Sequence, residues 1–193
     1  MLSTIKWVWI SYFVVALFGS LPSNGQETPK PRVIVTTDGE FEDRCSMGRF
    51  LLYANELDTK GIIHSSSKFH WKGNDTTESY QWHDVSWIEK HFQAYEEVYP
   101  NLILHDKSYP TPASLQQLVY EGNTELAGDM TEETPGSNRI VEVLLEPDTT
   151  PVWLQAWGGS NTIARALKTI EEEYPERKQE VMEKARLFMI LQQ

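Results

Sequence analysis

The sequence predicts an α/β protein with a largely parallel sheet and helices on both of its faces. Arg32–Thr37 (RVIVTT) is dominated by apolar and β-branched residues, which is typical of a central strand buried on both faces. Strand-like and helical segments then alternate along the chain, mostly through short connections. Because a helical crossover returns the chain to the end of the sheet where the previous strand began, neighbouring strands are expected to run parallel.

Hydrophobic spacing and breaker residues mark the elements of the first half. A helix is expected over Ser46–Leu57, where apolar residues recur every three or four positions. A second strand is expected over Thr59–Ser66. The polar stretch Ser67–Gln81 is too long for a tight connection, and loops of this length are often functional. The next helix is expected over Asp84–Tyr99, with Pro100 ending it.

Turn and capping residues mark the second half in the same way. Ser/Thr-Pro signals precede a helix within residues 109–122 that Gly122 closes, and a loop is expected over Asn123–Pro135. Ser137 is expected to cap the helix that follows. The remaining expected elements are a strand over Pro151–Trp157, a helix over Thr162–Tyr174, a charged helical piece over Pro175–Lys184 and a strand beginning at Ala185.

Residues 1–25 have the pattern of a secretory signal peptide. Lys6 precedes the apolar run Trp7–Gly19, and small, turn-forming residues follow it. This run of about 13 residues is shorter than the ~20 needed to span a bilayer, although an uncleaved membrane anchor is the alternative. We therefore expect a secreted or periplasmic protein without a stable membrane anchor after cleavage, and a domain over residues 26–193.

Composition narrows the class of partner. The formal net charge is −11, and no run of Lys and Arg occurs anywhere in the chain. A surface that binds nucleic acid needs clustered basic residues to neutralise phosphates, so nucleic acid is not an expected partner. Cys45 is the single cysteine, which rules out an internal disulfide.

Four acidic residues lie within the six positions directly after the first expected strand. They are Asp38, Glu40, Glu42 and Asp43. Ligands of α/β sheets bind at the carboxyl ends of the strands, which is where this group lies. Unpaired carboxylates that converge raise one another's pKa values, and a hard cation with oxygen ligands, such as Ca²⁺, removes that penalty. The alternative is an acidic first turn of the following helix, favoured by the helix dipole.

The order of residues in this turn resembles a known family. TTDGEFED is similar to the DTDPGxDD fingerprint of nucleoside hydrolases, whose aspartates hold Ca²⁺. The resemblance implies that Asp38 is both the catalytic base and a metal ligand, and that Glu42 and Asp43 are metal ligands. A second segment, WGGSNTIARAL, is similar to the GPLTNIA turn of the same family, and this implies a backbone carbonyl ligand at Asn161.

A subgroup of that superfamily resembles the chain more closely. PRVIVTTDGEFEDRCSMGRFLLYANELDTKGIIHSSSKFHWKG and YPTPASLQQLV look like the signatures of the DUF1593 proteins, which are described as nucleoside hydrolase-like and cellulose-binding Sde182-like. The resemblance covers nearly all of residues 31–193. It implies a Rossmann-like sheet and calcium-dependent hydrolysis, in which a carboxylate deprotonates a metal-bound water that attacks the anomeric carbon.

Departures from the family pattern bear on the substrate. The family's ribose-binding Asn aligns near Lys68, which suggests a larger or different sugar, or a polysaccharide, in place of a nucleoside. His70, Trp71 and Trp82 are candidates to stack on or hydrogen-bond such a sugar. Packing of these loop side chains on the domain itself is the alternative.

The end of the chain bears on activity. The superfamily takes a further calcium-ligating aspartate, and often a leaving-group histidine, from the C-terminal part of the domain, whereas this sequence stops at MILQQ. The expectation is therefore the N-terminal portion of a nucleoside hydrolase-like domain with the C-terminal part missing. Three functions remain open: a hydrolase of N-glycosidic or related glycosidic bonds, a non-catalytic carbohydrate (cellulose)-binding protein, and an inactive fragment.

Overall fold

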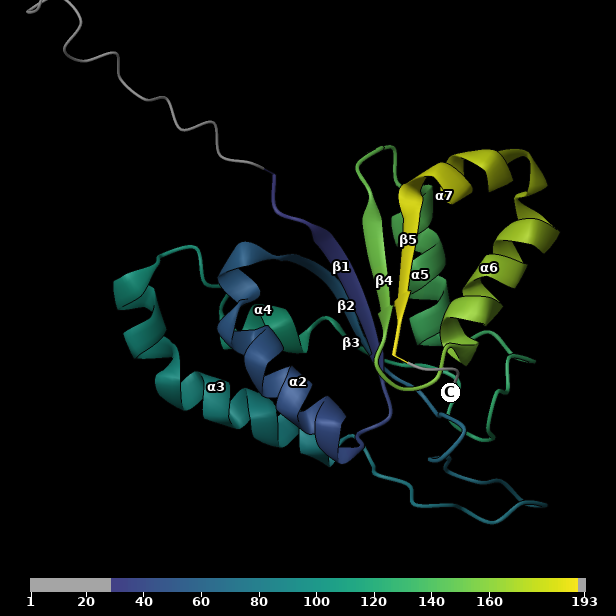
Figure 1. The fold of residues 1–193 in the computed structure, drawn as a ribbon, viewed down its shortest axis with the longest axis horizontal. Coiled ribbons are helices and arrows are strands. Elements are labelled where there is room, and N and C mark those ends of the chain that lie inside the picture. Colours follow the sequence, from purple (N-terminus) through teal and green to yellow (C-terminus); the bar gives the residue numbers. More distant parts are fainter. Residues whose placement is uncertain (1–28, 191–193) are drawn as a thin grey trace, which may run out of the picture.

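The computed structural model describes residues 29–190. A five-stranded, all-parallel sheet forms its centre (Figure 1). The strand order is β3-β2-β1-β4-β5, so the first strand lies in the middle. The strands are β1 (Arg32–Thr37), β2 (Asp58–His64), β3 (Val119–Glu121), β4 (Val152–Ala156) and β5 (Ala185–Met189). The expected signal peptide, residues 1–25, lies outside the described residues.

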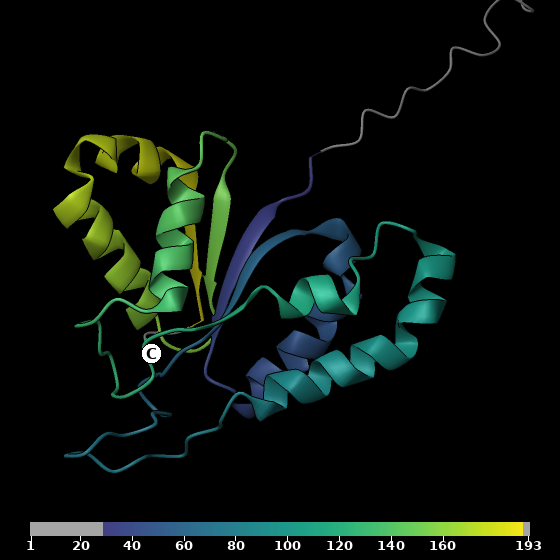
Figure 2. The same ribbon diagram turned by 180° about the vertical axis from the view of Figure 1, so that it is seen from behind.

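Helices cover both faces of this sheet, as Figures 1 and 2 show. Those on one face are α2 (Phe41–Leu52), α3 (Ser86–His105) and α4 (Pro112–Gln116). Those on the other face are α5 (Pro135–Leu145), α6 (Asn161–Glu173) and α7 (Lys178–Lys184). Two short 3₁₀ turns, Ala54–Glu56 and Pro175–Arg177, complete the described elements. The predicted fold class is confirmed.

The core consists of two hydrophobic clusters that the sheet separates. All six residues of β1 are buried, with Val33 and Val35 facing the cluster beneath α2 and α3. Ile34 faces the cluster beneath α5 and α6, where Leu154 of β4 also packs. Side chains alternate between faces along a strand, so a strand covered on both faces reads as a continuous apolar run.

The first helix begins earlier than the sequence suggests. Helix α2 starts at Phe41, not at Ser46, and ends at Leu52. Gly39 has a φ of +82°, a left-handed conformation in which glycine carries no steric penalty, and this turn lets the helix begin directly after the strand. Glu42 and Asp43 therefore occupy the first helical turn.

Pro100 does not end helix α3, contrary to the prediction. Helix α3 continues through Pro100 to His105. The residues beyond the proline include Leu102, which packs against the cluster beneath α2 and α3. This packing offsets the backbone hydrogen bond that a proline removes from a helix interior.

The helix expected within residues 109–122 is wrong in its second half. Only Pro112–Gln116 is helical, and Val119–Glu121 instead forms β3 beside β2. The register pairs Ile62 with Val119, and the amide of Ile62 donates to the carbonyl of Leu118. A strand of three residues is too short to show a period of two, so only the neighbouring strand reveals it.

The cap of α5 also differs from the prediction. Thr134, not Ser137, is the N-cap residue: its hydroxyl accepts from the Ser137 amide at 3.1 Å, and the Thr134 amide donates to the Ser137 hydroxyl at 2.8 Å. This reciprocal pair satisfies two amides that the helix itself leaves free.

No helix within residues 29–190 combines the length and hydropathy that a membrane crossing requires.

Candidate functional site

The carboxyl ends of the parallel strands meet at one edge of the sheet, the lower edge in Figure 1. The two long connections, residues 65–85 and 122–134, extend beyond this edge. Side chains from the ends of β1, β2 and β4 are thereby brought together with side chains from both loops.

Asp38 lies at the centre of this edge and is fully buried. Its Oδ1 accepts a hydrogen bond from the Glu40 amide at 3.0 Å, whereas its Oδ2 has no hydrogen-bond partner. Gly158, two residues beyond β4, packs against it so closely that a Cβ there would lie 2.8 Å from the carboxyl carbon of Asp38. A glycine is therefore required for β4 to approach this carboxylate.

Asp43 points back from the first turn of α2 toward the same place. Its Oδ2 accepts hydrogen bonds from the Thr37 hydroxyl at 2.6 Å and from the Asp38 amide at 2.9 Å. Burial raises the pKa of Asp43 to about 7, and the negative charge of Asp38 acts in the same direction. Two buried acidic groups side by side favour an additional positive charge between them, either a proton or a cation.

Glu40 and His70 approach Asp38 from the other side. The Nδ1 atom of His70 lies 3.3 Å from Asp38 Oδ2 and 3.9 Å from Glu40 Oε2. One ligand-type atom from each of the three side chains lies within 4.8 Å of the other two. His70 is buried, and its Nδ1 has no hydrogen-bond partner.

The predicted metal ligands are only partly brought together. Asp38 and Asp43 share the buried edge, whereas Glu42 is exposed on the outer side of the first turn of α2. The ligand predicted at Asn161 is its backbone carbonyl, and this stays a prediction. The residue is buried at the start of α6, where its side-chain amide donates to the Ser66 hydroxyl and to two loop carbonyls. Its side-chain amide therefore holds the two long loops against α6.

The predicted sugar-binding residues have different surroundings. Lys68 is exposed and its ammonium lies 5.5 Å from the ring centre of Phe69. Trp71 stacks on Tyr80 with ring centres 4.8 Å apart, which is packing within its own loop. Trp82 instead stacks on His64, with ring centres 4.6 Å apart, and lines a cavity.

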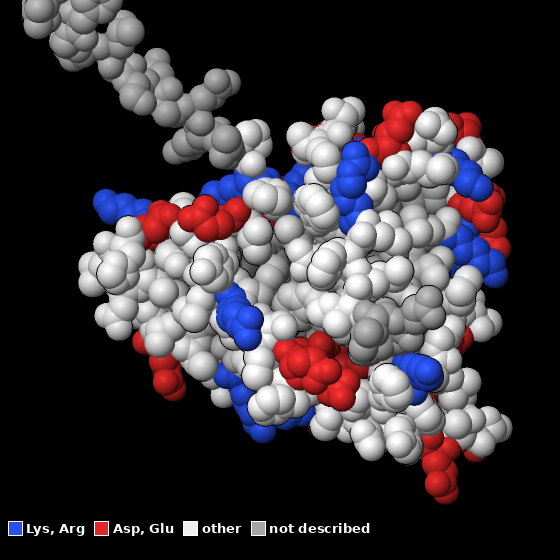
Figure 3. Space-filling model, viewed as in Figure 1, with Lys and Arg blue, Asp and Glu red and all other residues white. Residues whose placement is uncertain are grey.

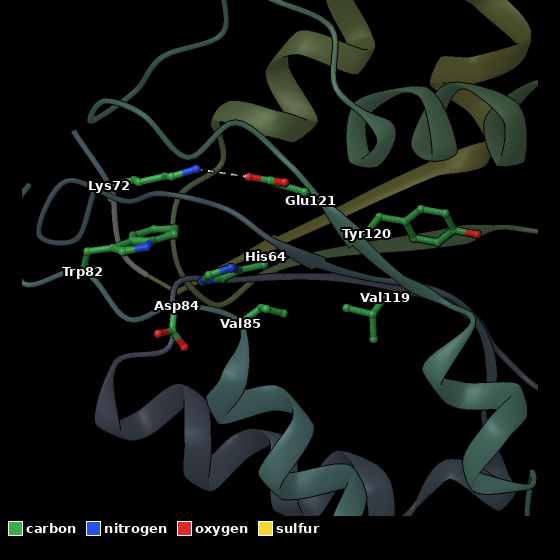
Figure 4. Close-up of a pocket in the computed structure, with 8 residues that line it drawn as sticks. All are labelled: His64, Lys72, Trp82, Asp84, Val85, Val119, Tyr120 and Glu121. Atoms are coloured by element: carbon green, nitrogen blue, oxygen red, sulfur yellow. Dashed lines mark ion pairs between the residues drawn. The ribbon is translucent and has the colours of Figure 1, made fainter. Parts of the chain in front are cut away.

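This cavity has a volume of about 340 Å³ and lies over the ends of β2 and β3 (Figure 4). Its walls combine apolar side chains with an ion pair, Lys72 Nζ to Glu121 Oε1 at 3.9 Å. The lining residues are His64, Lys72, Trp82, Asp84, Val85, Val119, Tyr120 and Glu121. Its volume lies within the range of pockets that bind small molecules.

His64 connects the cavity with the carboxylates. It ends β2, pairs in register with Thr37, and so lies one strand away from Asp38, which does not line the cavity. Burial lowers the pKa of His64 to about 4, so its ring is neutral at pH 7, and its Nε2 has no hydrogen-bond partner. His64 was not predicted as a site residue. The signal that could have identified it is its position: it is the last residue of β2, and Asp38 directly follows β1.

Surface charge agrees with the acidity of the site. Figure 3 shows a group of acidic side chains on the visible face near the carboxyl ends of the strands. Lys and Arg side chains form separate small patches on that face rather than one continuous basic surface.

Comparisons with known proteins agree with this fold. A family model described as "Cellulose-binding Sde182, nucleoside hydrolase-like domain" matches residues 32–193. A solved structure, a nucleoside hydrolase-related hypothetical protein from Saccharophagus degradans that is associated with carbohydrate metabolism, is similar with a TM-score of 0.74 and 30% sequence identity. The similarity covers 86% of this chain but only 39% of that protein. No curated protein matches the chain.

Proposed function

Because this chain belongs to the family of cellulose-binding Sde182, nucleoside hydrolase-like domains, we propose that it hydrolyses an N-glycosidic or related glycosidic bond with the help of Ca²⁺. The chain is a nucleoside hydrolase-like, carbohydrate-associated domain. The observation that carries the catalytic proposal is the buried carboxylate pair Asp38 and Asp43, with Asp38 Oδ2 left without a partner at the end of the central strand.

The donor set at this pair fits a calcium ion. Ca²⁺ binds carboxylate oxygens and tolerates irregular geometry. Burial raises the pKa of Asp43 and the charge of Asp38 adds to this shift, so a cation here would offset the cost of two buried negative charges. Asp38 and Asp43 are the residues that would hold it. The proposal draws no support from Glu42, whose side chain is exposed.

Asp38 is the proposed general base. When bound, the ion lowers the pKa of a water molecule and orients sugar hydroxyls. Asp38 Oδ2 would accept a proton from the attacking water as the water oxygen bonds to the anomeric carbon. The glycosidic bond would break at the same carbon, and the leaving group would depart with the bonding electron pair and take a proton from solvent. The buried carboxylates would also favour the positive charge that develops on the sugar ring.

A non-catalytic carbohydrate-binding function is the second candidate. It is favoured by the cavity, which contains an aromatic ring of Trp82 and the polar pair Lys72 and Glu121 but not Asp38. Indole rings pack against the apolar faces of sugars while charged groups bind the hydroxyls. In either case the proposed ligand is a sugar, nucleoside or polysaccharide.

The location of the protein is a separate proposal. From the signal-peptide pattern of residues 1–25 we propose that it is secreted or periplasmic.

One set of variants separates the two candidates. Hydrolysis of nucleosides and of soluble cello-oligosaccharides is measured with Ca²⁺ and with chelator, and binding of the same compounds is measured by calorimetry. A hydrolase loses about 10²-fold or more of its turnover on Asp38→Asn and on chelation. A binding protein shows no turnover, keeps its affinity in Asp38→Asn, and loses it in Trp82→Ala but not in Trp153→Ala, whose indole is 42% exposed and lies outside the cavity. If the protein shows no turnover and no binding, both proposals are contradicted.

A further inference from the structure

A second cavity, the α3 cavity, adjoins the cavity that Trp82 lines. It has a volume of about 370 Å³, and residues of α3, α4 and β3 form its walls. Val85, at the start of α3, and Val119, of β3, line both cavities (Figure 4 shows them in the Trp82 cavity), so the two are neighbours. We propose that the two cavities form one groove that binds a neutral, linear oligosaccharide longer than a disaccharide. The inference rests on the second candidate function, because it takes the ligand of the Trp82 cavity to be a sugar.

The α3 cavity extends along one side of its helix. Its lining residues from this part of the chain follow one another at intervals of three, one, three and one positions: Val85, Ile88, Glu89, Phe92 and Gln93. Residues three and four positions apart share one side of a helix. From the first of them to the last, the helix rises about 12 Å, which exceeds the length of one sugar ring. A ligand that fills the groove is therefore a chain of rings.

The polarity of the α3 cavity suits a sugar. Ile88 and Phe92 are each only 1% exposed and provide an apolar floor. The side chains of Glu89, Gln93 and Gln116 are exposed and provide a polar rim. A sugar ring packs its C–H groups on an apolar surface while amide and carboxylate groups bind its hydroxyls. The α3 cavity thus offers both kinds of contact.

The charges of the groove favour a neutral ligand. Among the described residues that line the two cavities, Lys72 is the single Lys or Arg, and its Nζ lies 3.9 Å from Glu121 Oε1. Asp84 and Glu89 add carboxylates, both at exposed positions. Like charges placed opposite one another cost binding free energy, so an anionic chain is disfavoured.

The groove leads to the carboxyl ends of the strands. His64, which lines the Trp82 cavity, pairs in register with Thr37, the residue before Asp38. A chain that occupies both cavities therefore has one end beside the edge of the sheet where the acidic residues gather.

The dependence of affinity on chain length tests the groove. Glucose and cello-oligosaccharides of two to six units are titrated into the full chain by calorimetry, and chromatography afterwards verifies that the sugars are intact. We expect cellotetraose to bind at least tenfold more tightly than cellobiose, because the longer chain gains contacts in the α3 cavity. Trp82→Ala should weaken the binding of every sugar.

Variants of the polar rim locate this gain. Gln93→Ala and Gln116→Ala should each lower the affinity for cellotetraose about fivefold, because each removes a hydrogen-bonding group, and should leave the affinity for cellobiose unchanged. Gln117→Ala is the matched control, since Gln117 is the exposed neighbour of Gln116 and lines neither cavity. It should bind every sugar as the wild type does.

The outcomes separate this inference from the proposed function. Cellobiose binding that Trp82→Ala removes, without any gain for longer chains, would overturn the inference and leave the second candidate function supported. Equal affinities of Gln116→Ala and Gln117→Ala for cellotetraose would also overturn it. If no sugar of any length binds, both the inference and the second candidate function fail. A tetramer of galacturonate should bind at least tenfold more weakly than cellotetraose, and equal affinities would contradict the choice of a neutral ligand.

Discussion

His64 shows how burial sets the chemistry of a single residue. Its ring stacks on Trp82 and makes an edge contact with Trp87. Desolvation disfavours the imidazolium and lowers the pKa of His64 from its ordinary value of 6.5 to about 4, although the charges of Asp38 and Asp84 act in the opposite direction. The cavity wall therefore presents a neutral imidazole at pH 7.

This shift makes stability depend on pH. Because the folded-state pKa of His64 is lowered, the unfolded chain binds more protons between pH 6.5 and pH 4, and the stabilisation present above pH 6.5 is lost as the pH falls toward 4. Between pH 7 and pH 4.5 the wild type should lose about 2 kcal/mol more of its free energy of unfolding than His64→Gln does. Urea unfolding at both pH values measures this. His105→Gln, at an exposed position, should lose as much as the wild type; equal losses in all three chains would contradict the prediction.

Helix α3 shows that packing can override a local breaker at the scale of an element. Pro100 is exposed inside the helix, yet helical residues continue beyond it to His105. Leu102 and Tyr99, on either side of the proline, pack against the cluster beneath α2 and α3. The last turns persist because burying these side chains outweighs the lost hydrogen bond.

Replacing the proline should therefore stabilise the protein. Pro100→Ala restores an amide donor to the helix and should raise the free energy of unfolding by about 1–3 kcal/mol, since the greater freedom of the unfolded chain offsets part of the gain. Thermal or urea unfolding measures it. Asn101→Ala, at an exposed position in the same turn, changes only helix propensity and should have an effect under about 0.7 kcal/mol. A Pro100 variant no more stable than the wild type would mean that the proline is already strain-free.

The sheet as a whole is covered unevenly, because its central strand is buried and its β5 edge is not. Central strand β1 is buried on both faces, whereas β5 forms an edge whose Leu187, Phe188 and Met189 are each about half exposed. Leu154 of β4 is fully buried, although it lies directly beside Leu187 in the register. The stabilising burial is thus concentrated in β1, β2 and β4.

Two leucines in register test this distribution. Leu154→Ala should cost about 2–5 kcal/mol of the free energy of unfolding, because it leaves a cavity in the core. Leu187→Ala, 48% exposed, should cost less than half as much because water already reaches this side chain. Denaturant unfolding of the two variants gives the comparison. Similar costs at both positions would show that another part of the protein or a second molecule covers β5 in solution.

Local sequence was sufficient for most of the architecture. The apolar run of β1, the period of the helices and the positions of β2, β4 and β5 all follow from residue spacing. The same patterns placed the carboxylates of Asp38 and Asp43 at the carboxyl end of the central strand, because parallel strands all end at one edge. Short-range preferences govern these features, and the sequence contains them directly.

Other features depended on contacts between distant segments. Strand β3 exists because it pairs with β2, and α3 passes Pro100 because its last turns are packed. The turn at Gly39, which packs against Trp87 of α3, starts α2 five residues early and leaves Asp43 buried and Glu42 exposed.

By itself the sequence therefore determined the fold class, the family pattern and the edge of the sheet where the acidic residues gather. Only the tertiary structure decided that Glu40 and His70 face Asp38, and that Trp82 covers His64 at a cavity. The physical reason is that helix and strand periods are set by neighbouring residues, whereas the positions of loop side chains are set by where the loop packs.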